Sequence, residues 1–158
     1  MAKGVQLKGG KQAGLVLKAL ARSLDAEAKR KHVRKGAKVI SDEAKLNASH
    51  TPELADAVGI VSNPDDAAGV IVTARRGKRY PKGYIAHIVE YGAAPHFIKP
   101  KKEGGLLKFN GGAFPLVNHP GVKATPFMRP AWDSKKDEAV QVIGQSIKKD
   151  IQAAAKGK

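Results

Sequence analysis

The amino-acid sequence predicts an α+β fold, in which long N-terminal and C-terminal helices pack on an antiparallel β-sheet. Near both ends of the chain apolar residues recur every three or four positions, as they do along one face of a helix. The middle instead holds short runs of β-branched residues between turn sequences. Helices, then strands, then a helix is the order typical of α+β domains. The length predicts a single domain over residues 1–158, with residues 1–10 as a flexible or partner-ordered segment and residues 155–158 as a frayed tail.

Two helices are expected before residue 50. The first covers residues 11–22, where leucines suggest a short apolar face. The second covers residues 26–47, and Asp25 precedes it in the position of an N-cap, a residue whose side chain accepts a hydrogen bond from a free backbone N–H. Its apolar positions recur at helical spacing: Val33, Ala37, Ile40 and Ala44. The second helix should end ahead of Pro52, because proline disfavours helical geometry in the residue before it.

The middle of the chain is expected to be β structure. Residues 57–63 and 68–74 are β-branched runs on either side of the turn sequence NPDDA, which predicts an antiparallel hairpin. Further short strands fit the sequences HFIKP, LLKFN and AFPLVN, joined by the turns KKEGG and GG. Residues 84–92 are ambiguous, because a short apolar run fits a helix as well as a strand. We favour a short helical or mixed element that ends at Gly92.

The last element is expected to be an amphipathic helix over residues 130–154. Pro130 suits the first helical position, where the absence of an N–H costs nothing, and Asp133 lies in the first turn, where a negative charge is favoured. The apolar side chains fall on one stripe: Trp132, Ala139, Ile143, Ile147, Ile151 and Ala154.

A proline-rich segment, HPGVKATPFMRPAWD, leads into this helix. Pro126 and Pro130 fix the backbone on both sides of Phe127 and Met128, so the two apolar side chains are held on a stiff support. We expect them to anchor the start of the helix on the core. The same stiff segment would also set the angle of an assembly surface.

The formal net charge of +15 is unevenly distributed. Residues 1–49 carry a net charge of +8 and residues 74–102 one of +7, whereas residues 50–73 hold four acidic residues and no Lys or Arg. A basic excess of this size predicts an anionic partner, either nucleic acid or the acidic surface of a protein. The absence of cysteine excludes disulfides and thiolate chemistry. Because the sequence has no run of 18 apolar residues, no membrane span is expected.

Two basic segments and one acidic turn are candidates for an interface. On a helix, Arg30, Arg34 and Lys38 stack at four-residue spacing, so like charges repel one another. They form either a solvated face relieved by nearby acidic side chains, or a surface that contacts nucleic acid or the acidic flank of another subunit. The loop RRGKRYPKG could likewise contact phosphates; its basic residues include Arg75, Arg76, Lys78 and Arg79. The acidic residues of the hairpin turn are Asp65 and Asp66.

Catalytic and metal-binding patterns are weak in this sequence. His87, Glu90, His96 and His119 are residue types that bind zinc, but no HExxH motif occurs, and hydrogen-bonded or exposed histidines are the interpretation we retain. No serine lies in a nucleophile elbow, and GGLLKFNGG lacks the Lys-Ser/Thr pair of a phosphate-binding loop. The sequence therefore predicts no enzyme, cofactor, metal ion or small-molecule substrate.

The stretches YIAHIVEYGAAPHFIKP, LLKFNGG and HPGVKATPFMRPAWDSKKDEA follow one another within residues 84–140. In order and spacing they resemble the tail-completion or neck proteins of long-tailed bacteriophages, of the minor tail protein Z type. The positions that carry the resemblance are Tyr84, Ala86, His87, Glu90, Tyr91, Gly92, His119, Pro120, Gly121, Pro126, Phe127, Arg129, Pro130 and Ala131.

The resemblance implies a structural virion protein at the head–tail junction, made in the host bacterial cytoplasm. Such proteins are expected to form a ring, with six copies to match the tail, and to contact the tail terminator and head-closure proteins, with genomic DNA in the lumen as a further partner. In such a ring the acidic hairpin of one subunit, residues 50–73, would dock on the basic helix (residues 29–38) or the basic loop (residues 75–82) of the next. Glu90 and Arg129 are expected to form a partly buried ion pair. A basic nucleic-acid-binding module is the alternative function.

Overall fold

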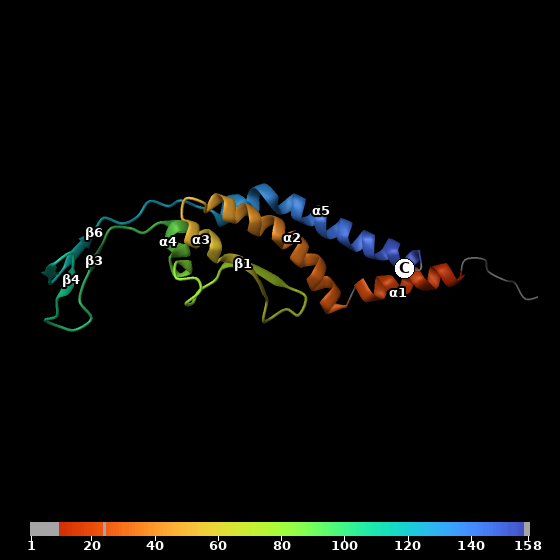
Figure 1. Cartoon of the computed structure of the whole chain (residues 1–158), viewed down its shortest axis with the longest axis horizontal. Coiled ribbons are helices and arrows are strands. Elements are labelled where there is room, and N and C mark those ends of the chain that lie inside the picture. Colours follow the sequence, from red (N-terminus) through yellow and green to blue (C-terminus); the bar gives the residue numbers. More distant parts are fainter. Residues whose placement is uncertain (1–9, 24, 157–158) are drawn as a thin grey trace, which may run out of the picture.

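The computed structural model describes residues 10–23 and 25–156 and shows an elongated molecule (Figure 1). The segment expected at residues 1–10 and the end of the expected tail lie almost wholly outside the described residues. The helices are α1 (Gly10–Ser23), α2 (Ala26–Asn47), α3 (Pro52–Ala57), η1 (Gly83–Ile85, a 3₁₀ turn), α4 (Ala86–Tyr91) and α5 (Met128–Ala155). The strands are β1 (Val58–Ser62), β2 (Val70–Ala74), β3 (His96–Ile98), β4 (Leu107–Phe109), β5 (Gly112–Phe114) and β6 (Val117–His119). This mixture confirms the α+β prediction.

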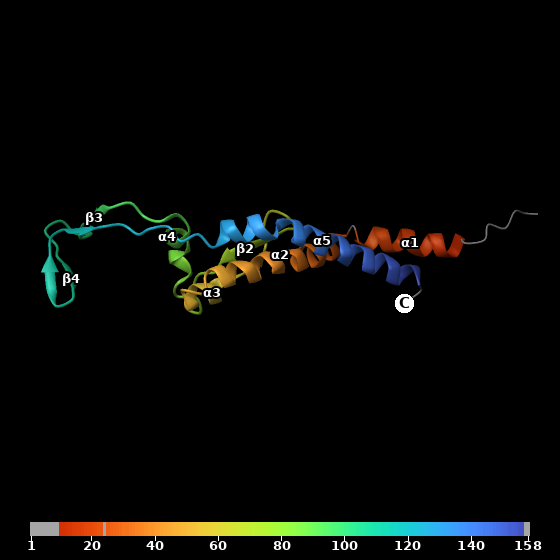
Figure 2. The ribbon, with the colours of Figure 1, turned by 90° about the horizontal axis from the view of Figure 1, so that it is seen from above.

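The body of the molecule is built on the long helices α2 and α5, which pack along each other, while α1 packs on the far part of α5 (Figures 1 and 2). The predicted bounds of α2 are confirmed, and the Asp25 carboxylate accepts a hydrogen bond from the Ala26 amide at 2.8 Å. The last helix begins at Met128, slightly ahead of the expected residue 130. No described helix is long and apolar enough to cross a membrane.

The core lies where α2, α3, β1 and the start of α5 meet. Small residues dominate it, which lets these elements approach closely, and Phe127 is its largest side chain. The buried residues that form one cluster are Ile40, Ala44, Ala48, Leu54, Val58, Phe127, Ala131 and Ala139. The sequence had not indicated α3, because a six-residue element is too short to show a helical period. Pro52 starts it at a position that tolerates the missing N–H.

A glycine sets the separation of α2 and α5. A Cβ atom at Gly36 would lie 2.7 Å from the Ala139 carbonyl oxygen and 2.7 Å from Cγ1 of Ile143. We expect Gly36→Ala to lower the free energy of unfolding by about 1–3 kcal/mol, since the helices would have to move apart. Gly144→Ala is the matched control, because a Cβ there meets nothing within 4 Å and alanine favours a helix. Urea unfolding measures the stability of both variants. If Gly36→Ala is as stable as the parent, α2 and α5 do not approach closely at Gly36.

The strands form three separate two-stranded antiparallel sheets in place of one continuous sheet. The predicted hairpin is present as β1–β2, with Val58 opposite Ala74 and Ser62 opposite Val70, and it packs against α2. The strands expected in the three later runs are also present, as the pairs β3–β6 and β4–β5. They are joined to the body by two extended segments. We call residues 93–125 the β arm; it projects from the end of the body in both views (Figures 1 and 2).

Candidate functional site

Several of the residues that carry the sequence resemblance meet at the base of the β arm, although they come from separate parts of the chain. The stretch Glu90–Gly92 ends α4, where the chain leaves the body, and the stretch His119–Pro130 returns from the arm and opens α5. Between them the arm closes on itself, because Ala93 and Val122 exchange two backbone hydrogen bonds of 2.9 Å. We call this junction the arm root.

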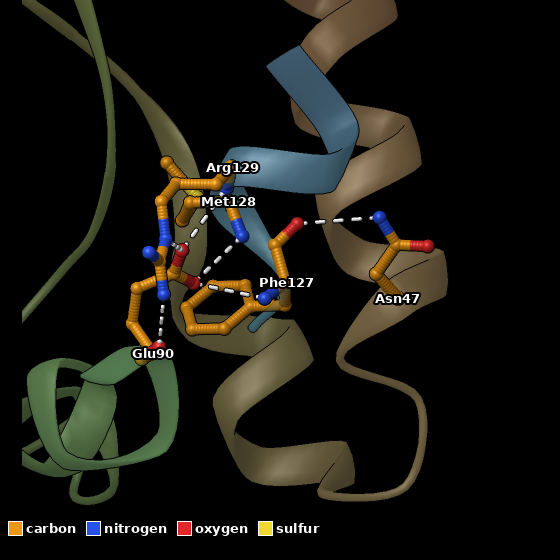
Figure 3. A network of polar contacts seen from close by, with 5 residues as sticks. All are labelled: Asn47, Glu90, Phe127, Met128 and Arg129. Carbon is orange, nitrogen blue, oxygen red and sulfur yellow. Dashed lines mark hydrogen bonds and ion pairs between the residues drawn. The ribbon is translucent and has the colours of Figure 1, made fainter. Parts of the chain in front are cut away.

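Glu90 is the centre of the arm root (Figure 3). Its side chain is buried, and Oε2 accepts hydrogen bonds from the amides of Phe127 at 2.8 Å and Met128 at 2.9 Å. Oε1 accepts one from the amide of Arg129 at 3.1 Å. The first amides of a helix have no partner within the helix, so a carboxylate from another element caps α5 here and lies at the positive end of its dipole.

Two opposing effects act on the ionisation of Glu90. Burial disfavours the charged form and raises the pKa, but hydrogen bonds from the amides of Met128, Phe127 and Arg129, and from the Arg129 side chain, outweigh it. The pKa of the Glu90 carboxyl is therefore held below its ordinary value. The charged form is the one that stabilises the junction.

Arg129 completes the expected ion pair. Its Nε atom donates to Oε1 of Glu90 at 3.0 Å, and its Nη2 atom donates to the Glu90 carbonyl oxygen at 2.8 Å. The guanidinium carbon also lies 4.8 Å from the centre of the Tyr91 ring, within the range of a cation–π contact. The Arg129 side chain is 55% exposed whereas that of Glu90 is 6% exposed, so the pair is buried on one side only.

Two glycines allow the outgoing and returning segments of the arm to approach each other closely at the arm root. Gly92 has φ +75° and Gly121 has φ +84°, a region that side chains rarely adopt. A Cβ at Gly121 would also lie 2.3 Å from the Ala93 carbonyl oxygen, and one at Gly92 would lie 2.7 Å from that of Val122. Glycine is therefore required at both positions, which fixes the direction in which the arm leaves the body.

Phe127 anchors the start of α5 on the core, as expected from the proline-rich segment. It is 1% exposed, and its carbonyl oxygen accepts a hydrogen bond from the Asn47 side chain at 3.2 Å (Figure 3). Met128 is half-buried beside the core, whereas Pro126 and Pro130 are exposed. The two prolines thus lie on the outside of a segment whose apolar side chains point inward.

The histidines do not gather with Glu90. His96 stacks on His119 with ring centroids 5.0 Å apart in the β arm, and His119 Nδ1 accepts a hydrogen bond from the Gly121 amide at 3.1 Å. His87 is exposed, and Glu90 is turned toward α5. Within the described residues, no group of three or more His, Asp or Glu side chains could hold a metal ion.

The three basic residues of α2 that the sequence put forward for an interface are engaged within their own chain. The Arg30 guanidinium donates to the Ala67 carbonyl oxygen, with a distance of 2.7 Å from Nε, and Arg34 donates to the Ile60 carbonyl oxygen at 3.4 Å. Lys38 pairs with Asp42 at 2.7 Å. The first two contacts hold the β1–β2 hairpin against α2.

In the basic loop after β2, one arginine is bound within its own chain and the other candidate residues are exposed. Arg75 donates to the carbonyl oxygens of Asp56 and Ala57 at 3.1 and 3.2 Å, and its guanidinium lies 4.0 Å from the Tyr80 ring centre. Arg76, Lys78 and Arg79 are exposed. Of these, Arg79 lies 5.9 Å from the same ring, while the side chains of Arg76 and Lys78 form no hydrogen bond or ion pair within the described residues.

The acidic turn between β1 and β2 carries two exposed aspartates. The Asp66 side chain accepts a hydrogen bond from the Ala68 amide at 2.9 Å, which closes the turn locally, and the Asp65 amide donates to the Asn63 side chain at 3.1 Å. Because the Asp65 and Asp66 carboxylates form no ion pair within the described part of the chain, the turn presents negative charge to its surroundings.

A second polar cluster, which the sequence did not indicate, joins α2 to α5. His32 is 1% exposed; its Nδ1 atom lies 2.8 Å from Oγ of Ser146, to which Lys35 also donates at 2.7 Å. Nε2 of His32 lies 3.6 Å from a carboxylate oxygen of Asp150. Serine, histidine and aspartate occur in hydrolases, but Ser146 is itself buried and already accepts the lysine, so we interpret the cluster as a link between the helices.

Comparison with known protein families gives a match over the first part of the chain. The model of the HK97-gp10-like family, which describes a bacteriophage HK97-gp10 tail component, matches residues 14–92, half of the chain. The matched region runs from α1 to the end of α4 and stops at Gly92, where the β arm begins. No curated protein and no solved structure matches the chain.

Proposed function

Because the chain belongs to the HK97-gp10-like family of bacteriophage tail components, we propose that it acts at the head–tail junction of the virion, as a tail-completion or neck protein. In this role copies of the chain assemble into a ring of about six subunits and help to join the finished tail to the capsid. The tail terminator and the head-closure proteins are its neighbours above and below.

The main observation in support of a ring is the shape of the subunit. The β arm extends beyond the body, and its described strands β3 to β6 form no extensive contact with a body helix (Figures 1 and 2). The base of the arm is bound to the body, where the Thr125 amide donates to the Val89 carbonyl oxygen at 2.8 Å. A subunit with a projecting arm at one end suits a head-to-tail contact, in which one face of each copy meets a different face of the next, and such contacts close into rings when the rotation allows.

The segregation of charge supports contacts between subunits. We propose that the acidic turn with Asp65 and Asp66 faces basic side chains of the next copy. Among the sequence candidates, Arg76, Lys78 and Arg79 are the most available for this contact, since Arg30, Arg34, Lys38 and Arg75 already bind groups of their own chain. Reversing the charges of α2 would therefore disturb the hairpin as well as any interface.

The charge contact predicts that Arg76→Glu, Lys78→Glu and Arg79→Glu together weaken assembly. We expect the protein concentration for half-assembly at low salt to rise at least about tenfold, because like charges would face each other across the contact. The control is the triple reversal of Lys148, Lys149 and Lys156, which changes the net charge equally on α5 and beyond. Light scattering after size-exclusion chromatography measures both; equal assembly of the two triple variants would refute the contact.

The ring itself is tested by negative-stain electron microscopy of the purified chain and of phage particles that lack it. We expect closed rings of one diameter, and particles in which heads and tails accumulate separately. The high net charge favours a basic nucleic-acid-binding module as the second candidate. In that case a monomer would bind DNA, with an affinity that falls steeply across a salt series, and no ring would form. Contacts of a ring with genomic DNA in its lumen would instead appear only together with assembly.

A further inference from the structure

The body carries an apolar groove of about 740 Å³ between α2, β2 and α5. Val33 and Ile40 line it from α2, Ile71 from β2, and Trp132 and Val140 from α5. The last two side chains are 55% and 67% exposed. Soluble monomers rarely leave a large contiguous apolar surface open to water, so such a groove marks a binding surface.

The β arm carries apolar side chains that its own strands cannot bury. Its two sheets each have two strands of three residues, below the size at which a sheet is stable on its own. Phe97 is 63% exposed, and Phe109 and Phe114 contact each other at 4.9 Å between centroids while remaining exposed. The other exposed apolar residues of the arm are Ile98, Leu106, Leu116 and Val122.

We propose that the β arm of one subunit occupies the α2–β2–α5 groove of the neighbouring copy. This inference rests on the proposed ring and specifies the contact that builds it. The occupant is a second copy, because the arm root directs the arm away from the body and the strands of the arm lie far from β2 in both views (Figures 1 and 2). The described part of each chain presents the arm at one place and this groove at another, so each subunit can give one contact and receive one, as ring closure requires.

Charge complementarity supports the same occupant. The β arm holds Lys99, Lys101, Lys102, Lys108 and Lys123 against the single acidic residue Glu103. Val70 lines the groove and directly follows the acidic turn. The charged residues that line the groove are Asp133, Arg129 and Lys136, with a net charge of +1, so the acidic side chains available to the arm are those of the turn. An arm that lies in the groove therefore adds its lysines to the basic loop of the same neighbouring copy as partners of Asp65 and Asp66.

Crosslinking tests which surfaces meet, and the chain has no cysteine to interfere. We expect Phe97→Cys protein mixed with Val140→Cys protein to give a linked dimer with a short bis-maleimide, and the double variant to give a ladder of oligomers. Phe97→Cys mixed with Leu46→Cys is the control, because Leu46 is 66% exposed on α2 outside the groove. A double variant linked only within one chain would overturn the proposal, since the arm would then occupy its own groove.

Charge insertion tests whether the contact drives assembly. Val140→Glu and Leu46→Glu place the same charge at helical positions of equal exposure, 67% and 66%, so both should melt like the parent. We expect only Val140→Glu to raise the concentration for half-assembly, by at least about tenfold. If the parent forms rings that Val140→Glu and Phe97→Glu leave intact, the arm contact is wrong and the ring stands. If the parent stays monomeric at all concentrations, the ring and the contact both fail.

Discussion

Glu90→Gln is expected to lower the free energy of unfolding by about 3 kcal/mol. The amide group keeps the size of the carboxylate but offers one acceptor oxygen and an NH₂ group, which would face amides that can only donate. Hydrogen bonds to a charged group contribute about 1.5–3 kcal/mol each, less when water reaches one partner. Because the Arg129 side chain is half-exposed, we assign most of the loss to the buried amide of Phe127 and the part-buried amide of Met128. Urea unfolding monitored by circular dichroism measures it.

The matched control for this substitution is Glu103→Gln, the same chemical change at an exposed position in the β arm. Glu103 accepts no side-chain or backbone hydrogen bond from the described residues, so its replacement should leave the unfolding midpoint unchanged. Two variants with equal midpoints would mean that the carboxylate does not cap α5.

The same capping carboxylate makes stability depend on pH. The pKa of Glu90 is held below its ordinary value, so the stabilisation is complete above the unfolded-state pKa of about 4.3. It is lost as the pH falls through the lower pKa of the folded state. The parent should therefore lose more stability than Glu90→Gln on acidification below about pH 4.3. An equal loss of stability in the two proteins on acidification would contradict a lowered pKa of Glu90.

The parts of the fold with local signals could be predicted from the sequence. Asp25 before an apolar period fixed the start of α2, and the turn NPDDA between β-branched runs specified the β1–β2 hairpin. The pairing of Glu90 with Arg129 was expected from the matched motif and is confirmed. The resemblance did not indicate that the Glu90 carboxylate also caps α5. It accepts three hydrogen bonds from the backbone amides at the start of that helix and one from the Arg129 side chain.

The parts that depend on distant contacts could not be predicted. Short runs joined by glycine-containing turns indicated strands after residue 95, but nothing local specifies whether such strands join the β1–β2 hairpin or leave the body as an arm. The direction of the arm depends on Gly92 and Gly121, where the outgoing and returning segments approach each other closely. His32 and Ser146 are 114 residues apart in sequence, and only the packing of α2 on α5 brings them together.

Phe127→Ala is expected to lower the free energy of unfolding by about 3–5 kcal/mol, the usual cost of removing a buried phenylalanine. The ring is the largest in the core and contacts α2, α3 and β1 through the cluster that includes Ala44, Leu54 and Val58. Its loss would leave a cavity beside the amides that Glu90 binds, so the cap on α5 should weaken with the core. Thermal and urea unfolding of the variant measure the loss.

Phe97→Ala makes the same change in the β arm. It distinguishes a ring that stabilises the core of the monomer from one that contacts a neighbouring copy. Because Phe97 is 63% exposed, its removal should change the free energy of unfolding of the monomer by less than about 0.5 kcal/mol. If the arm binds a neighbouring copy, the same variant should assemble more weakly, whereas Phe127→Ala should lose stability before assembly is tested. Large losses of monomer stability in both variants would mean that the arm packs on its own body, and the projecting arm would then be wrong.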